Sequence, residues 1–542
     1  MVGWALRLLI FILVAGGLVL FHSSRRQREP RTVTAAREKV LLIGNRTEIE
    51  TLDPHMATGV PEHKVISAIF DGLVGPGDED PEADAPAAAE SVEHENFTRW
   101  TFKLRKNGRW SDGVPVKADD FLFAFQRILT PEIASDYGPM LYCLLNAEAY
   151  HRGEIKDFSQ VGAKALDDYT LQLQLKGPTP YLPGMLKHYT WFPIPKHVVL
   201  RHGTITDRLN PWTQPENIVS NGPFKLKEWR FTHYLAVERN PFYWDAKSVR
   251  LREIHFFPIS SEATEERAFQ AQQLHLTDKV PMARIPYYQE KKDTSFHSYR
   301  TLGVQFVRMN MTRAPMKDLR VRQALSLALD RQSMVTNVLR AGEMPAHGLT
   351  PPGCAKGFET PAMITRDIAE ARRLLAEAGY PGGKGFPKIE MVINQTNTAR
   401  ALGEAMQEMW RKELGIQVSL LNQEWQVYLD KMRKLDYDLV LAGWVGDYPD
   451  PSTFLTMWKT GDGNNMTGFS NADYDAMISK SEVTAELTER MTVLQNAERL
   501  LLTQLPMTPV YWRVESYLAS PQVKNLRTSM LEHRSYKVID LE

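Results

Sequence analysis

Apolar and polar residues alternate with two distinct periods along this chain, and these periods predict its strands and helices. Alternation at period two over 98–105 (TRWTFKLR) is typical of a half-buried strand. The run DYDLVL at 436–441 has the pattern of a strand that is buried on both faces. The same reasoning predicts a short apolar strand starting at residue 40, a hairpin at 221–245 that ends at Asn240-Pro241, and strands within 167–177, 416–423 and 507–519.

Helical spacing appears between these strands. Residues 117–129 combine it with acidic residues in the first turn, which favour the positive end of the helix dipole. The same spacing predicts one amphipathic helix over 318–339 and a second over 366–380, with Gly379 as its C-terminal cap. A third helix is predicted over 403–415, where it is closed by a glycine. Because helices alternate with strands in the second half, we expect mixed α/β domains with parallel strands there.

Three stretches lack such a period. Residues 22–37 are basic and polar and are expected to form a linker. The acidic, Pro- and Ala-rich stretch 75–90 is expected to be a surface loop. Asn-Gly and Asp-Gly pairs predict a turn within 106–113. No repeat of 20–50 residues is visible.

The amino terminus carries a long apolar segment. Residues 4–21 are interrupted only by Arg7, which is typical of a signal peptide or a membrane anchor. No small-x-small cleavage site follows, so we expect an uncleaved signal or anchor segment over 1–24 and a linker over 25–37. The first cysteine is Cys143, which excludes lipid attachment near the amino terminus.

The charges after this segment raise an objection to an extracytoplasmic location. By the positive-inside rule, basic residues that follow an anchor favour a cytoplasmic location for the chain behind it. The orientation therefore stays open on this evidence alone. The residues concerned are Arg25, Arg26, Arg28 and Arg31.

Composition limits the classes of partner. Lys+Arg and Asp+Glu both total 65, so the formal net charge is zero and nucleic-acid binding by bulk electrostatics is not expected. The 542 residues suffice for two or three domains with a large core. Cys143 and Cys354 have no metal-binding spacing; they either form one disulfide or remain free thiols.

Catalytic motifs are missing. The stretch GYPGGKGF (379–386) has some likeness to a phosphate loop, but it is one residue short and Gly385 stands where Ser or Thr would bind the metal ion. We interpret it as a helix-ending loop. His188 and His197 have no carboxylate or cysteine at ligand spacing, so they are expected to be surface or packing residues. We predict no catalysis, no metal site and no cofactor.

The loop AGWVGDYPDPSTFL at 442–455 contains the strongest binding signal. It follows the buried strand 436–441, and the tips of such strands are where α/β sheets hold ligands. Asp447 and Asp450 lie beside Pro449 and Pro451, so either carboxylate can cap a turn. Whether Asp447 caps a turn or awaits a cation is left open by the local sequence.

Many ordered stretches, from about residue 40 to 515, resemble the bacterial family 5 extracellular solute-binding proteins, and specifically the oligopeptide-binding components of ABC importers. The segment from WTFKLR through WSDG to FAFQRI is typical of that family. The other matching stretches are LDPHMATGVPEH, VGAKALDDYTLQLQL, NPWTQPENIVSNGPFKLKEW, ERNPFYWD, DLRVRQALSLALDR, EWQVYLDKM and AGWVGDYPDPSTFL.

The resemblance implies an α/β, two-lobed periplasmic-binding-protein type II fold with an additional third domain and hinge closure over the ligand. Peptide would be held extended by β-augmentation, with its side chains in hydrated pockets. The expected boundaries are 38–72, 197–298 and 513–542 for lobe I, 73–196 for the extra domain II, and 299–512 for lobe III.

The resemblance also assigns ligand-binding residues. An aspartate of the GW…DY loop pairs with the ligand's α-ammonium in this family, and Asp447 stands at that position. Such a charged hydrogen bond contributes roughly 1.5–3 kcal/mol, which implies a ligand with a free amino terminus. The other assigned residues are Tyr137 beside the ammonium, Gly443, Trp444 and Val445 as the strand edge, Gly59 and Val60 facing it, Trp425 as a pocket aromatic, and Tyr511 or Trp512.

The chain departs from the family pattern where the ligand's carboxylate is expected. Ala399 and Met432 stand at two positions that are basic in well-studied members, and Leu441 replaces an interior arginine. Arg400 and Arg433 follow the first two by one residue and are our candidates for the C-terminal carboxylate contacts. Ligand length and C-terminal recognition therefore stay open.

We expect a monomeric, extracytoplasmic oligopeptide-binding protein, anchored to the inner membrane by residues 4–21, that captures short peptides for an ABC permease driven by cytoplasmic ATPases. One alternative is a dipeptide, haem or nickel-complex carrier of the same fold. Another is an anchored peptide sensor or chaperone without an importer, and the third is a hydrolase.

Overall fold

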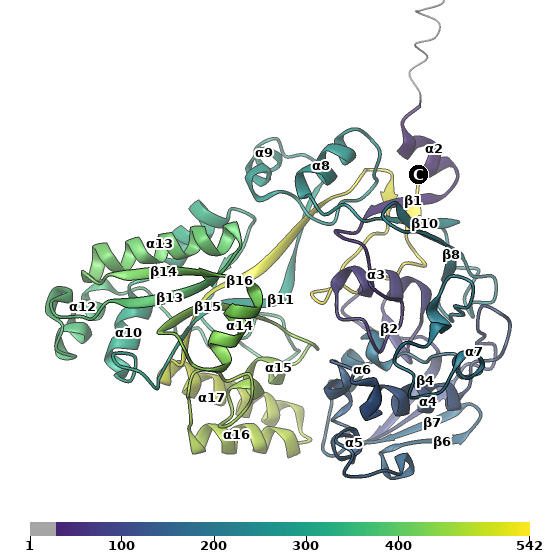
Figure 1. Ribbon diagram of the computed structural model, residues 1–542, viewed down its shortest axis with the longest axis horizontal. Helices are drawn as coiled ribbons and strands as arrows, with labels where there is room; N and C mark the ends of the chain where they lie inside the picture. The colour runs from purple at the N-terminus through teal and green to yellow at the C-terminus, as the bar shows by residue number, and fades with distance from the viewer. Residues whose placement is uncertain (1–28) are drawn as a thin grey trace, which may run out of the picture.

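The computed structural model describes residues 29–542. The apolar segment 4–21, expected to be an anchor, lies outside the described residues. From residue 29 onward, no helix is both long and apolar enough to cross a membrane. Three larger sheets organise this part of the chain. Figure 1 shows sheets 1 and 2 on one side of the molecule and sheet 3 on the other.

Sheet 1 has the strand order β1-β10-β9-β8. Its first strand is buried along its whole length, as the apolar run predicts, and pairs in parallel with β10. The predicted hairpin forms β8 and β9 and ends before Asn240. The strands are β1 (Val40–Gly44), β8 (Phe224–Arg230), β9 (Tyr234–Arg239) and β10 (Glu253–Phe257), and the neighbouring helices are α2 (Arg31–Arg37), α3 (Val60–Ile69), α8 (Glu262–Gln270) and α9 (Ile285–Glu290). Helix α7 (Lys196–His202) packs instead against α4 (Ala118–Leu129).

Sheet 2 has the order β4-β5-β7-β6 and is antiparallel throughout. The predicted strand within 98–105 forms β5 with the expected alternating burial. Helix α4 begins where the Asp120 carboxylate accepts the Lys117 N–H at 2.9 Å. The elements are β4 (Ala89–Glu95), β5 (Arg99–Leu104), β6 (Ala163–Asp167), β7 (Thr170–Gln174), α4 (Ala118–Leu129), α5 (Ala147–His151) and α6 (Leu182–Met185).

Sheets 1 and 2 share one continuous hydrophobic core. It joins Leu41 and Ile254 of sheet 1 to Phe102 and Leu171 of sheet 2. Buried Trp110, which lies between β5 and α4, belongs to the same cluster. The two sheets therefore pack as one unit, although they belong to different segments of the chain.

Sheet 3 has the order β12-β16-β11-β15-β13-β14 and mixes parallel with antiparallel neighbours. Its β15 is buried on both faces, as predicted: Leu439 and Leu441 enter one core cluster, Val440 and Ala442 the other. The strands are β11 (Phe296–Met309), β12 (Met344–Pro345), β13 (Ile389–Asn394), β14 (Val418–Gln423), β15 (Leu439–Val445) and β16 (Met507–Leu518).

Helices cover both faces of sheet 3. The predicted helices that end at Gly379 and Gly415 form α12 and α13, and both glycines have the positive φ expected after a helix end. The helices are α10 (Leu319–Leu327), α11 (Arg331–Ser333), α12 (Ile368–Glu377), α13 (Asn397–Leu414), α14 (Trp425–Arg433), α15 (Ser452–Leu455), α16 (Ala472–Val483) and α17 (Leu487–Gln504).

Two long strands run from sheet 3 towards sheet 1. Figure 1 shows β11 and β16 side by side across the space between the two halves of the molecule. Their pairing breaks between Arg300 and Val304, where the register shifts. The remaining small elements are the hairpin β2 (Val74–Pro76) and β3 (Asp84–Pro86) and the pair β17 (Val523–Lys524) and β18 (Asp540–Leu541).

The prediction of one helix over 318–339 is wrong. Helix α10 ends at Leu327, and α11 begins after Asp330 and continues as a π-helical segment over Met334–Leu339. The break occurs because the Asp330 carboxylate accepts the Ser333 N–H at 2.9 Å and so starts a new helix.

Two stretches expected to be irregular contain helices or strands. The two cysteines form no disulfide. Residues 31–37 of the predicted linker form α2, with Ala35 and Ala36 buried. The acidic stretch 75–90 contributes to β2, β3 and the start of β4 rather than forming only a loop. Cys143 and Cys354 are both free, so the disulfide alternative is excluded.

Candidate ligand-binding cleft

The loop after β15 separates the roles of its two aspartates. Asp450 caps a turn, since its Oδ1 accepts the Ser452 N–H at 3.0 Å. The same carboxylate forms a buried ion pair with Arg490, with distances of 2.7 and 2.8 Å. The turn-capping role that the sequence left open between the two aspartates therefore belongs to Asp450.

Asp447 has a different environment. Its backbone N–H donates to Thr453 Oγ1 at 3.1 Å, but its carboxylate has no hydrogen bond or ion pair with any other residue of 29–542. Burial raises the pKa of this carboxyl to about 6, and no neighbouring cation offsets that effect. A desolvated carboxylate without a partner gains most from a cation supplied by a ligand.

Tyr137 is brought to Asp447 from the other side of the molecule. It precedes the short 3₁₀ turn Gly138–Leu141, close to sheet 2, whereas Asp447 follows a strand of sheet 3. Burial, with the nearby Asp447 as a second cause, raises the pKa of the Tyr137 hydroxyl. The pair thus forms only where the two halves of the molecule approach each other.

The predicted strand edge is open on one side. Gly443, Trp444 and Val445 pair with β11 through Gln305, Val304 and Gly303. On its other side, β15 pairs with β13 only at Leu439 and Val440. Within the described chain, the backbone of residues 443–445 therefore has no strand partner on that side. An extended peptide can pair there as an added strand.

Gly59 and Val60 face this edge across a cavity of about 550 Å³, here called the strand-edge cavity. Gly59 stands before α3, and a Cβ at this position would lie 2.1 Å from a carboxylate oxygen of Glu62. A larger residue at 59 would have to displace the Glu62 side chain. The strand-edge cavity brings together the predicted residues Gly59, Val60, Tyr137, Gly443, Trp444, Val445 and Asp447.

Three histidines line the same cavity, two of them (His63 and His533) buried, and sequence analysis did not assign them to the site. His63 packs against His533 and His188, with ring centroids 5.2 and 6.2 Å apart. The His63 Nε2 atom is buried without a hydrogen-bond partner in the structure described, and burial lowers the pKa of His63 to about 4. Because these residues are far apart in sequence, no spacing motif joins them. His188 does pack as expected, but it also forms part of the wall.

Other predicted residues lie outside the strand-edge cavity. Trp425 is 52% exposed and stacks on Tyr428, with centroids 5.3 Å apart. Arg400 and Arg433 are exposed and line none of the cavities described here. Tyr511 lines an adjoining cavity of about 720 Å³, here called the polar cavity, whereas Trp512 packs into the core of sheet 3.

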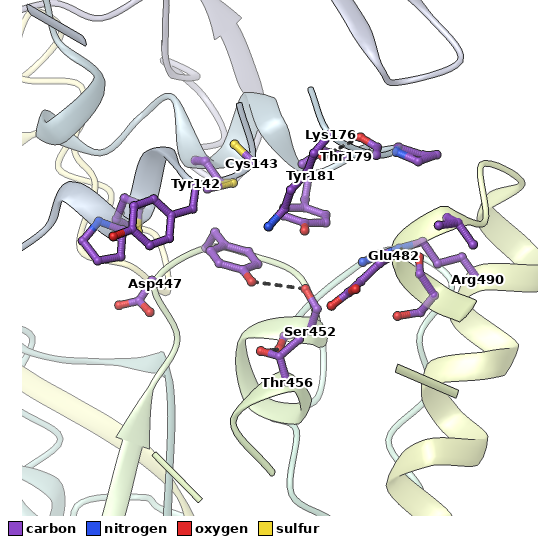
Figure 2. A pocket seen from close by; sticks show the side chains of 18 of the residues that line it. Tyr142, Cys143, Lys176, Thr179, Tyr181, Asp447, Ser452, Thr456, Glu482 and Arg490 are labelled. Carbon is purple, nitrogen blue, oxygen red and sulfur yellow. Dashed lines mark hydrogen bonds between the residues drawn. The ribbon is translucent and has the colours of Figure 1, made fainter. Parts of the chain in front are cut away.

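A third cavity of about 610 Å³, here called the seam cavity, lies on the sheet 2 side of Asp447. Figure 2 shows Tyr142, Cys143, Lys176 and Tyr181 on one wall and Asp447, Ser452, Glu482 and Arg490 on the other. The Tyr181 ring stacks on Tyr448 with centroids 4.8 Å apart and planes at 9°. This contact joins the two halves of the molecule directly beside Asp447.

Comparison with known proteins gives this geometry a context. Residues 85–466 match the family model described as bacterial extracellular solute-binding proteins, family 5 Middle. The chain belongs to the family 5 bacterial extracellular solute-binding proteins. The resemblance seen in the sequence is therefore confirmed.

Relatives in this family match over almost the whole chain. The periplasmic oligopeptide-binding protein OppA of Salmonella typhimurium is 35% identical over 506 residues, with 91% of each chain covered. The periplasmic murein peptide-binding protein MppA of Escherichia coli is 32% identical over 516 residues, with 94% of each covered.

Solved structures of family 5 proteins share the fold. The unliganded open form of the murein tripeptide-binding protein MppA has a TM-score of 0.79 at 30% identity, covering 93% of this chain and 98% of that one. Haemophilus influenzae OppA in complex with the peptide RPPGFSPFR has a TM-score of 0.76 at 30% identity, covering 93% and 99%. The predicted α/β type II binding-protein fold is confirmed.

Proposed function

We propose that this protein binds short peptides with a free amino terminus outside the cytoplasm and delivers them to the permease of an ABC importer. The observation that carries the proposal is the desolvated Asp447 carboxylate, which has no partner in the described part of the chain and faces the strand-edge cavity. A peptide ammonium supplies the missing charge. Names of relatives as oligopeptide- and murein peptide-binding proteins support the ligand class.

The bound peptide lies extended along residues 443–445. Its backbone takes the vacant hydrogen bonds of β15, so affinity comes from main-chain groups rather than from side-chain identity. Its ammonium meets Asp447 and the Tyr137 hydroxyl. Gly59 and Val60 close the opposite wall.

Closure involves movement between the two halves. We assign 38–72, 197–298 and 513–542 to lobe I, 73–196 to domain II and 299–512 to lobe III. Strands β11 and β16 cross between lobes I and III, and the register break after Arg300 is a suitable place for bending. A monomer, held at the membrane by residues 4–21, suffices for this cycle.

The experiment is native mass spectrometry of protein purified from cells without refolding, followed by release and sequencing of any ligand. Peptides of two to five residues are expected. A cleft that is empty, or that holds one metal complex or haem, would contradict the proposal.

Calorimetry then tests the site. Free and N-acetylated versions of one peptide are compared on the wild type and on Asp447→Asn. Acetylation is expected to weaken wild-type binding at least tenfold, because it removes the charge that Asp447 binds. The matched control is Asp473→Asn, an exposed aspartate of α16. Equal affinities for both peptides on the wild type would refute the ammonium assignment.

A further inference from the structure

Asp447 is one of two uncompensated charges on the walls of the strand-edge cavity. The second is a cluster formed by Lys279, Arg513 and Glu515, which also lines the adjoining polar cavity. The two Glu515 oxygens are divided between its neighbours: Oε1 accepts from Arg513 Nη2 at 3.0 Å and Oε2 from Lys279 Nζ at 2.8 Å. Two cations thus share one carboxylate.

The ionisation of this cluster follows from its contacts. Burial alone would raise the pKa of Glu515, but Lys279 and Arg513 outweigh that effect and lower it. The cluster therefore carries a net positive charge at neutral pH. Arg513 makes one side-chain hydrogen bond within the described residues, to Glu515, which leaves Nε and Nη1 available. A guanidinium edge of this kind matches a carboxylate.

The remaining charges on these walls are already compensated or point elsewhere. Arg46 is paired with Asp278, which also binds Lys64, and Lys64 lies 4.0 Å from the carboxylate of Glu532, the other acidic wall residue. In the polar cavity, Glu343 accepts the Ala341 N–H at 2.8 Å, and burial raises its pKa. Glu262, on the wall of the same cavity, is exposed at the start of α8. The strand-edge cavity is therefore negative at Asp447 and positive at Arg513.

Gly303 directs Arg513 towards the peptide-binding edge. Gly303 pairs with Val445, and a Cβ at 303 would lie 2.9 Å from Cδ of Arg513. The Arg513 side chain thus lies over β11 at Gly303, the residue that is paired with Val445. A larger residue at 303 would have to displace the Arg513 side chain.

Strand spacing gives the separation of the two charges. Neighbouring strands lie about 4.8 Å apart, so the Arg513 backbone is about 10 Å from Val445, two strands away. Asp447 is two residues beyond Val445, which places the two backbones roughly 12 Å apart. Most of this separation runs across the strands, so a carboxylate reaches Arg513 where the ligand leaves the strand edge and crosses the cavity, not after a fixed number of residues paired along that edge.

We propose that Arg513, assisted by Lys279, binds a carboxylate of the bound peptide and so favours ligands whose carboxylate reaches the Arg513 wall of the strand-edge cavity. The inference rests on the proposed function, because it takes the peptide ammonium at Asp447 as its reference. Arg400 and Arg433, the candidates from the sequence, line neither cavity. The carboxylate is either the carboxyl terminus or an acidic side chain.

The test uses calorimetry with three ligands: trialanine, trialanine amide and Ala-Ala-Glu amide. Wild-type protein is expected to bind trialanine at least tenfold more tightly than its amide, as for one charged hydrogen-bonded pair. Arg513→Gln is expected to bind the two equally. Tight binding of Ala-Ala-Glu amide would show that a side-chain carboxylate is accepted as well, and weak binding would restrict Arg513 to the carboxyl terminus.

Two further variants guard against misfolding and against a general loss of binding. Arg513→Lys keeps the charge and should restore part of the preference for the free acid. Gly303→Ala, which displaces the Arg513 side chain, should reduce that preference without removing any charge. The matched control is Arg411→Gln, an exposed arginine on α13 that pairs with Glu408.

The outcomes separate this inference from the proposed function. If wild-type protein binds none of the peptides, the proposed function itself fails. If wild-type protein binds both trialanine forms equally, or Arg513→Gln keeps the preference for the acid, peptide binding stands and the role of Arg513 is overturned. Asp447→Asn should weaken both forms and still prefer the acid.

Discussion

Asp450 and Arg490 form a buried ion pair with two hydrogen bonds of 2.7 and 2.8 Å, only three residues beyond the unpaired carboxylate of Asp447. The two aspartates of one loop are thereby divided between structure and binding. Arg490 compensates Asp450 and anchors the loop, while Asp447 stays desolvated and free of protein partners in the described chain.

This division predicts opposite effects of matched substitutions on stability. Asp450→Asn is expected to lower the free energy of unfolding by about 3–5 kcal/mol, because it leaves Arg490 buried without a counter-charge. Asp447→Asn is expected to raise the free energy of unfolding of the ligand-free protein by about 1–3 kcal/mol at pH 7.5, because it removes a desolvated charge. Urea unfolding measures both.

The gain from Asp447→Asn should depend on pH in a defined direction. The pKa of Asp447 is about 6 in the folded protein, above its ordinary value of 3.8. The wild type therefore loses stability as pH rises from about 4 to 6, where the unfolded chain ionises first. The advantage of the variant should vanish below pH 4. A pH-independent difference would contradict the assignment.

Peptide affinity should fall as the pH is lowered. The ligand ammonium needs the ionised Asp447 carboxylate, which is protonated in the free protein below a pKa of about 6. Between pH 7.5 and 5, the dissociation constant is expected to rise roughly tenfold, with proton release on binding at the lower pH. Calorimetry in buffers of different ionisation enthalpy measures both effects. In Asp447→Asn, this pH dependence should be absent.

The stack of Tyr181 on Tyr448 is expected to favour the closed arrangement of the two halves. Tyr181→Ala removes an aromatic pair worth about 0.5–1.5 kcal/mol, which corresponds to a roughly two- to tenfold loss of peptide affinity. Small-angle scattering should show a larger radius of gyration for the ligand-free variant. Phe231→Ala, at an exposed aromatic in the β8–β9 turn, serves as the control and should change neither quantity.

Both thiols are expected to be free and protected in the folded protein. Cys354 is 3% exposed. Cys143 is only partly buried, on the wall of the seam cavity, but desolvation raises the pKa of its thiol to about 12, so little reactive thiolate forms at neutral pH. A thiol reagent should therefore modify two groups per chain in denaturant without prior reduction, and react slowly with the native protein. Fewer than two reactive groups in denaturant would indicate a disulfide.

Local patterns predicted much of the fold. Strand β5 follows from period-two alternation, and helix α4 follows from helical spacing with acidic residues in its first turn. Strand β15 follows from a pattern that is typical of burial on both faces. The helix over 318–339 failed because amphipathic spacing continues through Asp330, whereas the contact of its side chain with the Ser333 N–H breaks the helix.

The sequence by itself determined the family, the type of fold and the loop that carries Asp447, because ordered motifs and residue periods are properties of neighbouring residues. Only the tertiary structure decided which aspartate is free, since Arg490 comes from a helix 40 residues away. It also decided that Tyr137, three histidines and Arg513 share one cavity. Such convergence depends on how distant segments pack, because desolvation and charge pairing act through space.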